Sequence, residues 1–141
     1  MSSQELNDAV KAAGFTKEML GFQSEDDFTF FIDGVIDRAQ HKVRADVGAE
    51  GYASTDPEVA AAVFDAVVDW SVSKVWERRK ARVLASAAIS GEQRTRAGLS
   101  EEASIKAAMD DYEDDLRRVN RLAGKSPDLA VGAAVSSHFT S

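Results

Sequence analysis

Residues 56–88, DPEVAAAVFDAVVDWSVSKVWERRKARVLASAA, decide the fold of this chain. Asp56 offers a side-chain acceptor for a helix start, and Pro57 suits the first helical position. No glycine or proline follows before Ala88, so about 30 residues can form one continuous helix, whereas an average helix has about 11 or 12. The sequence therefore predicts one helix of unusual length over residues 57–88.

The apolar face of this long helix changes side partway along. At about 100° per residue, Val59, Val63 and Trp70 share one face. Beyond Ser71 that face becomes charged, and the apolar side chains gather on the opposite side. Burying each of them stabilises a fold by about 1.5–3 kcal/mol, so a neighbouring element should cover them. Either another segment of the same chain or a second subunit can do so, and the residues concerned are Val72, Val75, Trp76 and Val83.

A run of basic residues, 78–82, lies near the end of the long helix. Such a run can be a solvated helix end, a surface for a charged protein partner, or a phosphate-binding patch. No aromatic side chains interleave with the cations as base-stacking platforms would, which disfavours nucleic acid. In the partner hypothesis, the basic residues at the subunit or partner interface are Arg78, Arg79 and Arg82.

Two further helices are predicted before the long one, each between a capping residue and a glycine. The first, residues 2–13, is short and amphipathic. The second, residues 24–47, carries a long aliphatic stripe that should face the core. A linker with bulky apolar side chains, residues 15–22, joins them. The boundary residues are Ser2, which forms a capping box with Glu5, then Gly14, Ser24 and Gly48.

A fourth helix is predicted over residues 100–124, with Ser100 at its start. Its apolar residues step by four and three, which gives a coiled-coil seam of about two and a half heptads that needs a neighbouring helix. The expected ion pairs along it are Glu113 with Arg117 and Asp114 with Arg118, and the seam consists of Ile105, Met109, Tyr112, Leu116, Val119 and Ala123.

The last stretch, residues 125–141, alternates bulkier side chains with small or polar ones. This period of two predicts an extended arm, which is either disordered or docked on a neighbouring subunit. We therefore expect an all-α fold, a small bundle of about four helices with one long helix, divided into a helical domain of residues 1–124 and the arm. The bulkier residues of the arm, which we assign to the interface, are Leu129, Val131, Val135 and Phe139.

Composition excludes several classes of function. The chain has 141 residues, enough for one domain with a core. It has no cysteine and only two histidines, which rules out disulfides, thiol catalysis and sulfur-bound zinc. The formal net charge of −7 disfavours a surface that grips nucleic acid, and no apolar run is long enough to span a membrane. We expect no catalytic residue, no metal and no cofactor.

One acidic pattern resembles a metal-binding motif. Residues 110–114, DDYED, fit the Asp-Asp-x-x-Asp pattern with which terpene synthases and prenyltransferases hold magnesium against a diphosphate. That chemistry needs a large helical cavity and a second acidic cluster facing the first. The competing interpretation is a solvated helix face whose acidic side chains pair with arginines of the same helix. An enzyme that binds magnesium and a diphosphate remains a third hypothesis, after the two given below.

The order of elements resembles the head-to-tail connector, or adaptor, proteins of tailed bacteriophages. The resemblance runs over residues 24–124. It rests on the aliphatic helix FIDGVIDRA from Phe31, a loose Gly-x-x-x-Tyr loop at residues 48–52, the Asp-Pro-Glu-Val start of the long helix with Trp70, and the Arg-Leu-Ala-Gly ending at Gly124. The long alanine-rich third helix and the insertion around Gly91 depart from the simplest members.

The resemblance implies a structural virion protein of the neck, assembled in the host cytoplasm, that catalyses no reaction. Such proteins form a ring of identical copies, commonly dodecameric, that joins the portal to the tail. The implied partners are copies of the chain itself, the portal protein, a tail-side stopper or terminator protein, and genomic DNA that passes without specific binding. The alternative hypothesis is a cellular helical adaptor that binds one protein partner through the coiled-coil seam.

Overall fold

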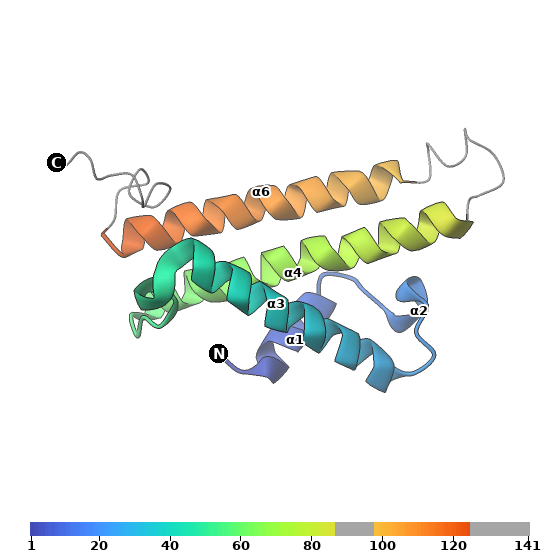
Figure 1. Ribbon diagram of the computed structural model, residues 1–141, viewed down its shortest axis with the longest axis horizontal. Helices are drawn as coiled ribbons and strands as arrows, with labels where there is room; N and C mark the ends of the chain where they lie inside the picture. The colour runs from blue at the N-terminus through green and yellow to red at the C-terminus, as the bar shows by residue number, and fades with distance from the viewer. Residues whose placement is uncertain (87–97, 125–141) are drawn as a thin grey trace.

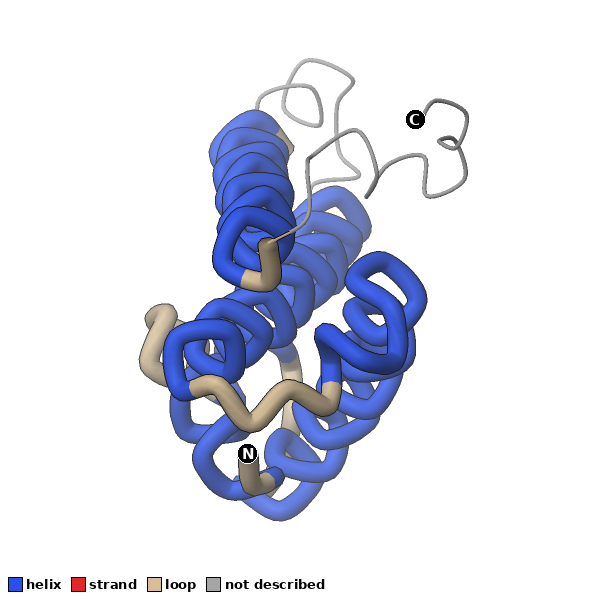
Figure 2. Tube along the Cα trace, turned by 90° about the vertical axis from the view of Figure 1, so that its left-hand side faces the viewer, coloured by secondary structure: helices blue, strands red, loops and turns tan. Residues whose placement is uncertain are grey.

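The computed structural model describes residues 1–86 and 98–124. These residues form five helices, one of which is central to the other four. α4 lies at the centre, because every other helix packs against it. α6 runs antiparallel to α4 along the long axis of the molecule, and the view along that axis shows α6 above the other helices (Figures 1 and 2). An all-α bundle is confirmed for these residues. The helices are α1 (Ser3–Lys11), α2 (Lys17–Leu20), α3 (Glu25–Tyr52), α4 (Pro57–Ser86) and α6 (Leu99–Leu122).

Three of the predicted helix starts are confirmed by their side-chain caps. The Ser2 hydroxyl accepts the Glu5 N–H at 3.1 Å, and the Glu5 carboxylate accepts the Ser2 N–H at 3.2 Å, which completes a capping box. The Ser24 hydroxyl accepts a backbone N–H of α3 at 3.1 Å. The Asp56 carboxylate accepts the Glu58 N–H at 2.9 Å at the start of α4. These caps could be predicted because each uses residues close in sequence.

The sequence predicts that the second helix ends at Gly48, but in the structure this helix continues beyond it. The residue departs from helical geometry, with φ 86° and ψ 158°, yet helical hydrogen bonding resumes beyond it as far as Tyr52. This positive φ is easily reached by glycine, which has no Cβ to clash with the backbone. Gly48 is therefore a kink within α3, and the predicted Gly-x-x-x-Tyr loop forms a final helical turn.

Two further boundaries differ from prediction. Residues 15–22, expected to be a plain linker, contain the four-residue helix α2, which Thr16 caps by accepting the Met19 N–H at 3.2 Å. Ser100 is not the cap of the last helix, because Gly98 occupies the N-cap position and no side chain caps there. The last two residues of the predicted long helix, the insertion around Gly91 and the predicted arm at residues 125–141 lie outside the described residues.

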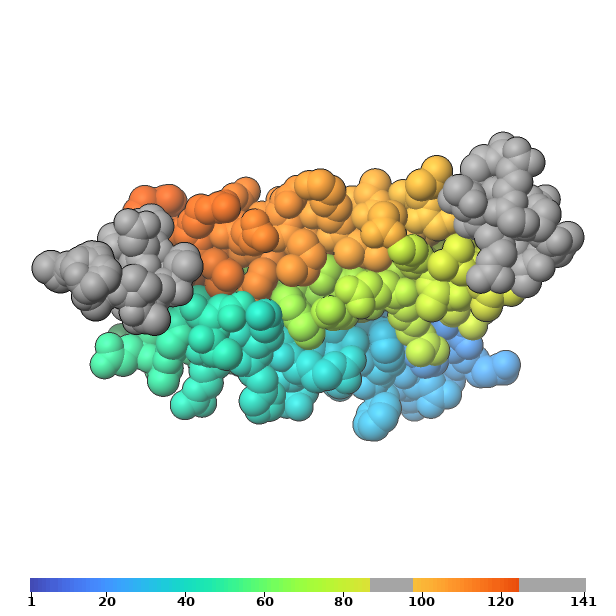
Figure 3. All heavy atoms as spheres, turned by 45° about the horizontal axis from the view of Figure 1, so that its top comes forward, coloured from blue at the N-terminus to red at the C-terminus, as the bar shows by residue number. Residues whose placement is uncertain are grey.

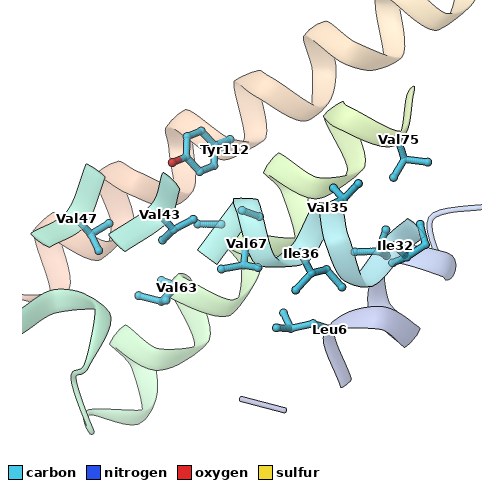
Figure 4. Packing of buried hydrophobic residues seen from close by; sticks show 14 of the residues in the cluster. Leu6, Ile32, Val35, Ile36, Val43, Val47, Val63, Val67, Val75 and Tyr112 are labelled. Carbon is cyan, nitrogen blue, oxygen red and sulfur yellow. The ribbon is translucent and has the colours of Figure 1, made fainter. Parts of the chain in front are cut away.

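The core is a single apolar cluster that all five helices share. Aliphatic side chains of α3 and α4 meet between the two helices, with Leu6 of α1 on one side and Tyr112 of α6 on the other (Figure 4). Ile32, Val63 and Val67 are all at most 1% exposed. The predicted stripe of the second helix therefore faces the core, and it fixes α3 across α4.

Candidate interaction surface

The basic run of α4 packs largely against its own chain. Arg79 donates a hydrogen bond from Nη1 to the Met19 carbonyl at the end of α2, at 2.8 Å. A cation at this position satisfies a carbonyl that a helix end leaves free. The Arg82 guanidinium lies where a Cβ on Gly21 would stand, and Gly21 has φ 79°. These arginines attach α2 to α4, a role that the sequence analysis did not foresee.

Arg78 stacks between two aromatic rings. Its guanidinium carbon lies 4.5 Å from the centroid of the Phe22 ring and 4.8 Å from that of Phe31. Each contact is a cation–π interaction, which stabilises by about 0.5–2 kcal/mol. Arg78 Nε is buried and has no hydrogen-bond partner among the described residues. The stacked guanidinium therefore has hydrogen-bonding capacity to spare.

A groove of about 470 Å³ opens beside this stack, and we name it the aromatic–arginine groove. Phe30 stands at its edge with 81% of its surface exposed, an unusual position for so large an apolar side chain. Neither Arg38 nor Arg78 forms an ion pair with another described residue. The groove is lined by Phe22, Asp27, Phe30, Phe31, Gly34, Arg38 and Arg78.

A second groove, of about 340 Å³, lies between α4, α6 and the residues that follow α1, and we name it the acidic groove. Trp76 is partly exposed in its wall and packs edge-on against Phe15, with 5.0 Å between ring centroids. Neither Asp69 nor Asp111 forms an ion pair with a described residue. The groove is lined by Ala13, Val68, Asp69, Val72, Trp76, Ser104, Ala107, Ala108 and Asp111.

Two carboxyl groups meet across the interface of α4 and α6 below the acidic groove. Asp115 of α6 is 8% exposed, and its Oδ2 is buried without a hydrogen-bond partner among the described residues, close to Asp69 of α4. Burial raises the pKa of Asp115 to about 8, and the proximity of Asp69 and Asp65 adds to the rise. Burial also raises the pKa of Asp69. The raised pKa of Asp115 therefore favours its protonated form at neutral pH.

Tyr112 links α6 to α3 beside this pair. Its hydroxyl donates a hydrogen bond to Asp46 Oδ2 at 2.5 Å, and Lys42 forms an ion pair with the same carboxylate at 3.2 Å. Burial and the hydrogen bond to Asp46 raise the pKa of Tyr112, so its hydroxyl stays a donor at ordinary pH. The ring is 2% exposed, which makes Tyr112 part of the core.

The predicted coiled-coil seam faces α4 and the core of its own chain. Tyr112 and Val119 are buried, Ile105, Met109 and Leu116 are partly buried, and Ala123 is exposed. Figure 3 shows α6 lying along α4 over most of its length. An adaptor that bound a partner through this seam would first have to displace α4. The chain itself supplies the neighbouring helix that the seam requires.

The ion pairs along α6 agree with prediction in one case and not in the other. Glu113 lies 3.8 Å from Arg117, as expected. The prediction that Asp114 pairs with Arg118 is wrong. Asp114 pairs with Arg117 at 2.6 Å, and Arg118 pairs with Asp65 of α4, also at 2.6 Å. Tertiary packing thus overrides the local spacing rule for Arg118.

The predicted interface residues fall into three groups. Val75 is 0% exposed and belongs to the core, so in this conformation it cannot contact a partner. Val72, Trp76 and Val83 are partly exposed, and the first two line the acidic groove. Arg82 is exposed, whereas Arg78 and Arg79 are partly buried by the contacts above. The four arm residues, Leu129, Val131, Val135 and Phe139, lie outside the described residues.

The sequence analysis missed several residues of both grooves. Phe30 lies off the aliphatic stripe of α3, and an aromatic residue on the polar face of a helix is a signal that could have found it. Asp115 directly follows the acidic run at residues 110–114, and it is buried. No local pattern separates Asp115 from its exposed neighbours, because its burial depends on where α4 lies.

Searches for relatives found no match: no family model, curated protein or solved structure matches this chain. In residues 1–86 and 98–124, no group of three or more histidine or acidic side chains could hold a metal ion. No helix in these ranges has both the length and the hydropathy needed to cross a membrane.

Proposed function

We propose that this chain is the subunit of a head-to-tail connector ring in a tailed bacteriophage. In this role it joins the portal to the tail-side stopper or terminator protein and lets genomic DNA pass. The observation that carries the proposal is the presence of two unlike grooves in one small bundle, one aromatic and basic, the other apolar and acidic. The proposal also rests on the resemblance seen in the sequence, of which the order of α3, α4 and α6 forms part, whereas residues 48–52 form a helical turn and not the loop of that resemblance.

Two unlike surfaces suit a ring. A contact between identical surfaces joins two copies and is then satisfied, whereas a contact between different surfaces leaves one of each kind free on every new copy. Rotation then closes the series into a circle. A small bundle with a different groove on each side has the surfaces that such a contact needs.

The charge of the chain fits a passage for DNA. Its formal net charge is −7, and exposed acidic side chains such as Asp110, Glu113 and Asp114 cover the outer face of α6. Cationic contacts to phosphates release counterions and hold DNA, so a channel with few free cations lets it slide. In the proposed ring these acidic surfaces face the lumen.

The experiment that tests the proposal is a measurement of assembly state. Native mass spectrometry and negative-stain electron microscopy of the purified chain, over rising concentration, should show closed rings of one stoichiometry. A protein that stays monomeric at the highest concentration, or that forms only closed dimers, contradicts the proposal. Binding of the rings to purified portal would then identify the head-side surface.

A further inference from the structure

The aromatic–arginine groove presents a ridge that can enter another surface. Phe30, Gly34 and Arg38 follow one another at intervals of four residues, so they lie in one row along α3. Gly34 has no side chain and nothing near its Cβ position, which leaves the Phe30 ring free on that side. An exposed ring and a guanidinium without an ion-pair partner in residues 1–86 and 98–124 thus project together from the same helix.

The acidic groove has the complementary features. Small side chains of α6, including Ala107 and Ala108, leave room beside Trp76 in the groove of about 340 Å³. Asp111 is exposed at this groove and has no ion-pair partner in the described part of the chain. A groove with these walls fits a bulky apolar side chain that is accompanied by a cation.

We infer that the aromatic–arginine groove of one copy docks on the acidic groove of a second copy, with Phe30 against Trp76 and Arg38 facing Asp111. The inference rests on the proposed function, since it names the surfaces through which neighbouring ring subunits touch. Opposite charges at the two surfaces set the orientation of the contact. The Phe30 ring supplies apolar area, of which a phenylalanine buries about 150–250 Å².

The positions of the two grooves allow this contact to repeat. Arg78 lines the first groove and Trp76 the second, and two residues along a helix correspond to a rotation of about 160° between their side chains. The grooves therefore lie on nearly opposite sides of α4. A copy that uses its aromatic–arginine groove on one neighbour keeps its acidic groove available for another.

Charge reversal of one residue in each groove tests the pairing. Arg38→Asp and Asp111→Arg should each raise the concentration needed for half-assembly about tenfold or more, because each places like charges opposite one another. An equal mixture of the two variants should assemble at nearly the wild-type concentration. Where the two variants alternate, every contact joins either two native residues or two reversed ones, and both combinations have opposite charges.

Matched controls separate the groove contact from a general effect of charge. Arg44→Asp on α3 and Glu113→Arg on α6 change exposed residues that line neither groove, and both should assemble like the wild type. Circular dichroism establishes that all four variants fold. Phe30→Ser should also weaken assembly about tenfold without a change of fold, since its ring is 81% exposed in the single chain.

The outcomes distinguish this inference from the proposed function. If the wild type forms rings and neither groove variant weakens them more than its control, the docking surfaces are wrong and the ring function stands. If each variant weakens assembly but the mixture does not restore it, Arg38 and Asp111 do not face one another. A wild type that never assembles overturns both proposals.

Discussion

The two sides of α4 pack against neighbours of different chemical character, one apolar and the other carrying carboxyl groups. On the side of α1 and α3, the helix meets aliphatic and aromatic side chains such as Ile32 and Phe28. On the side of α6, Asp69 of α4 lies close to Asp115 of α6. The first interface is apolar at its centre, so its packing should contribute little to the pH dependence of stability. The second places a carboxyl group between two helices, and burial raises its pKa to about 8, so the attachment of α6 should respond to pH.

The largest effect is expected on the apolar side. Phe28→Ala removes a ring that is 2% exposed and should lower the free energy of unfolding by about 3–5 kcal/mol, because it deletes buried apolar surface and leaves a cavity. Urea denaturation followed by circular dichroism measures this change. Phe30→Ala is the matched control, since that ring is 81% exposed, and it should change stability by less than about 0.5 kcal/mol. Equal losses in the two variants would show that the core is wrongly located.

The second prediction concerns pH and the carboxyl pair. Burial raises the pKa of Asp115 from its ordinary value of 3.8 to about 8 in the folded chain. The folded state therefore holds a proton that the unfolded state releases, and stability should fall as pH rises from about 4 through about 8. We expect a loss of roughly 1–3 kcal/mol between pH 5 and pH 9, measured by thermal or urea denaturation.

Asp115→Asn tests the origin of that pH dependence. The amide keeps a donor toward Asp69 and cannot ionise, so the variant should lose much of the pH dependence and exceed the wild type in stability at pH 9. Asp114→Asn, at an exposed neighbouring position, should follow the wild-type profile. A wild-type slope that persists unchanged in Asp115→Asn would place the titrating group elsewhere.

The smallest effect is expected at the link between α6 and α3. Tyr112→Phe removes the hydroxyl that donates to Asp46 but keeps the buried ring, and Asp46 retains its ion pair with Lys42. The free energy of unfolding should fall by about 1 kcal/mol, the usual net worth of such a hydrogen bond. Urea denaturation at pH 6 measures it. A loss as large as that of Phe28→Ala would mean that the phenol supports much more than one hydrogen bond.

Much of the fold was predictable because its signals are local. The caps at Ser2, Ser24 and Asp56 use side chains within three residues of the groups they bind, and the stripe of α3 follows from helical period alone. The sequence does not distinguish a kink at Gly48 from a helix end, because a glycine with positive φ is common at kinks and at helix ends. α2 was missed because a helix of four residues is too short for a periodic pattern.

The candidate site was less predictable because its parts meet only in three dimensions. The change of apolar side along α4 indicated that another element must cover Val75 and Trp76, but it could not decide between the same chain and a second subunit. Val75 is buried within the chain, and Phe15 packs on Trp76. Arg79 bonds to a carbonyl that is 60 residues away in sequence. The acidic run of α6 reads as uniform in sequence, and only the position of α4 distinguishes Asp115 from the rest.

The central position of α4 also has a consequence for how the chain opens. Every other helix packs on α4, and these neighbours exclude solvent from its middle turns. Local fraying therefore cannot expose those turns. Backbone amides around Ala66 should therefore exchange with deuterium only through cooperative loss of the whole bundle. A chain held in this way meets a mechanical load along the axis of α4 as one unit, and it yields all at once.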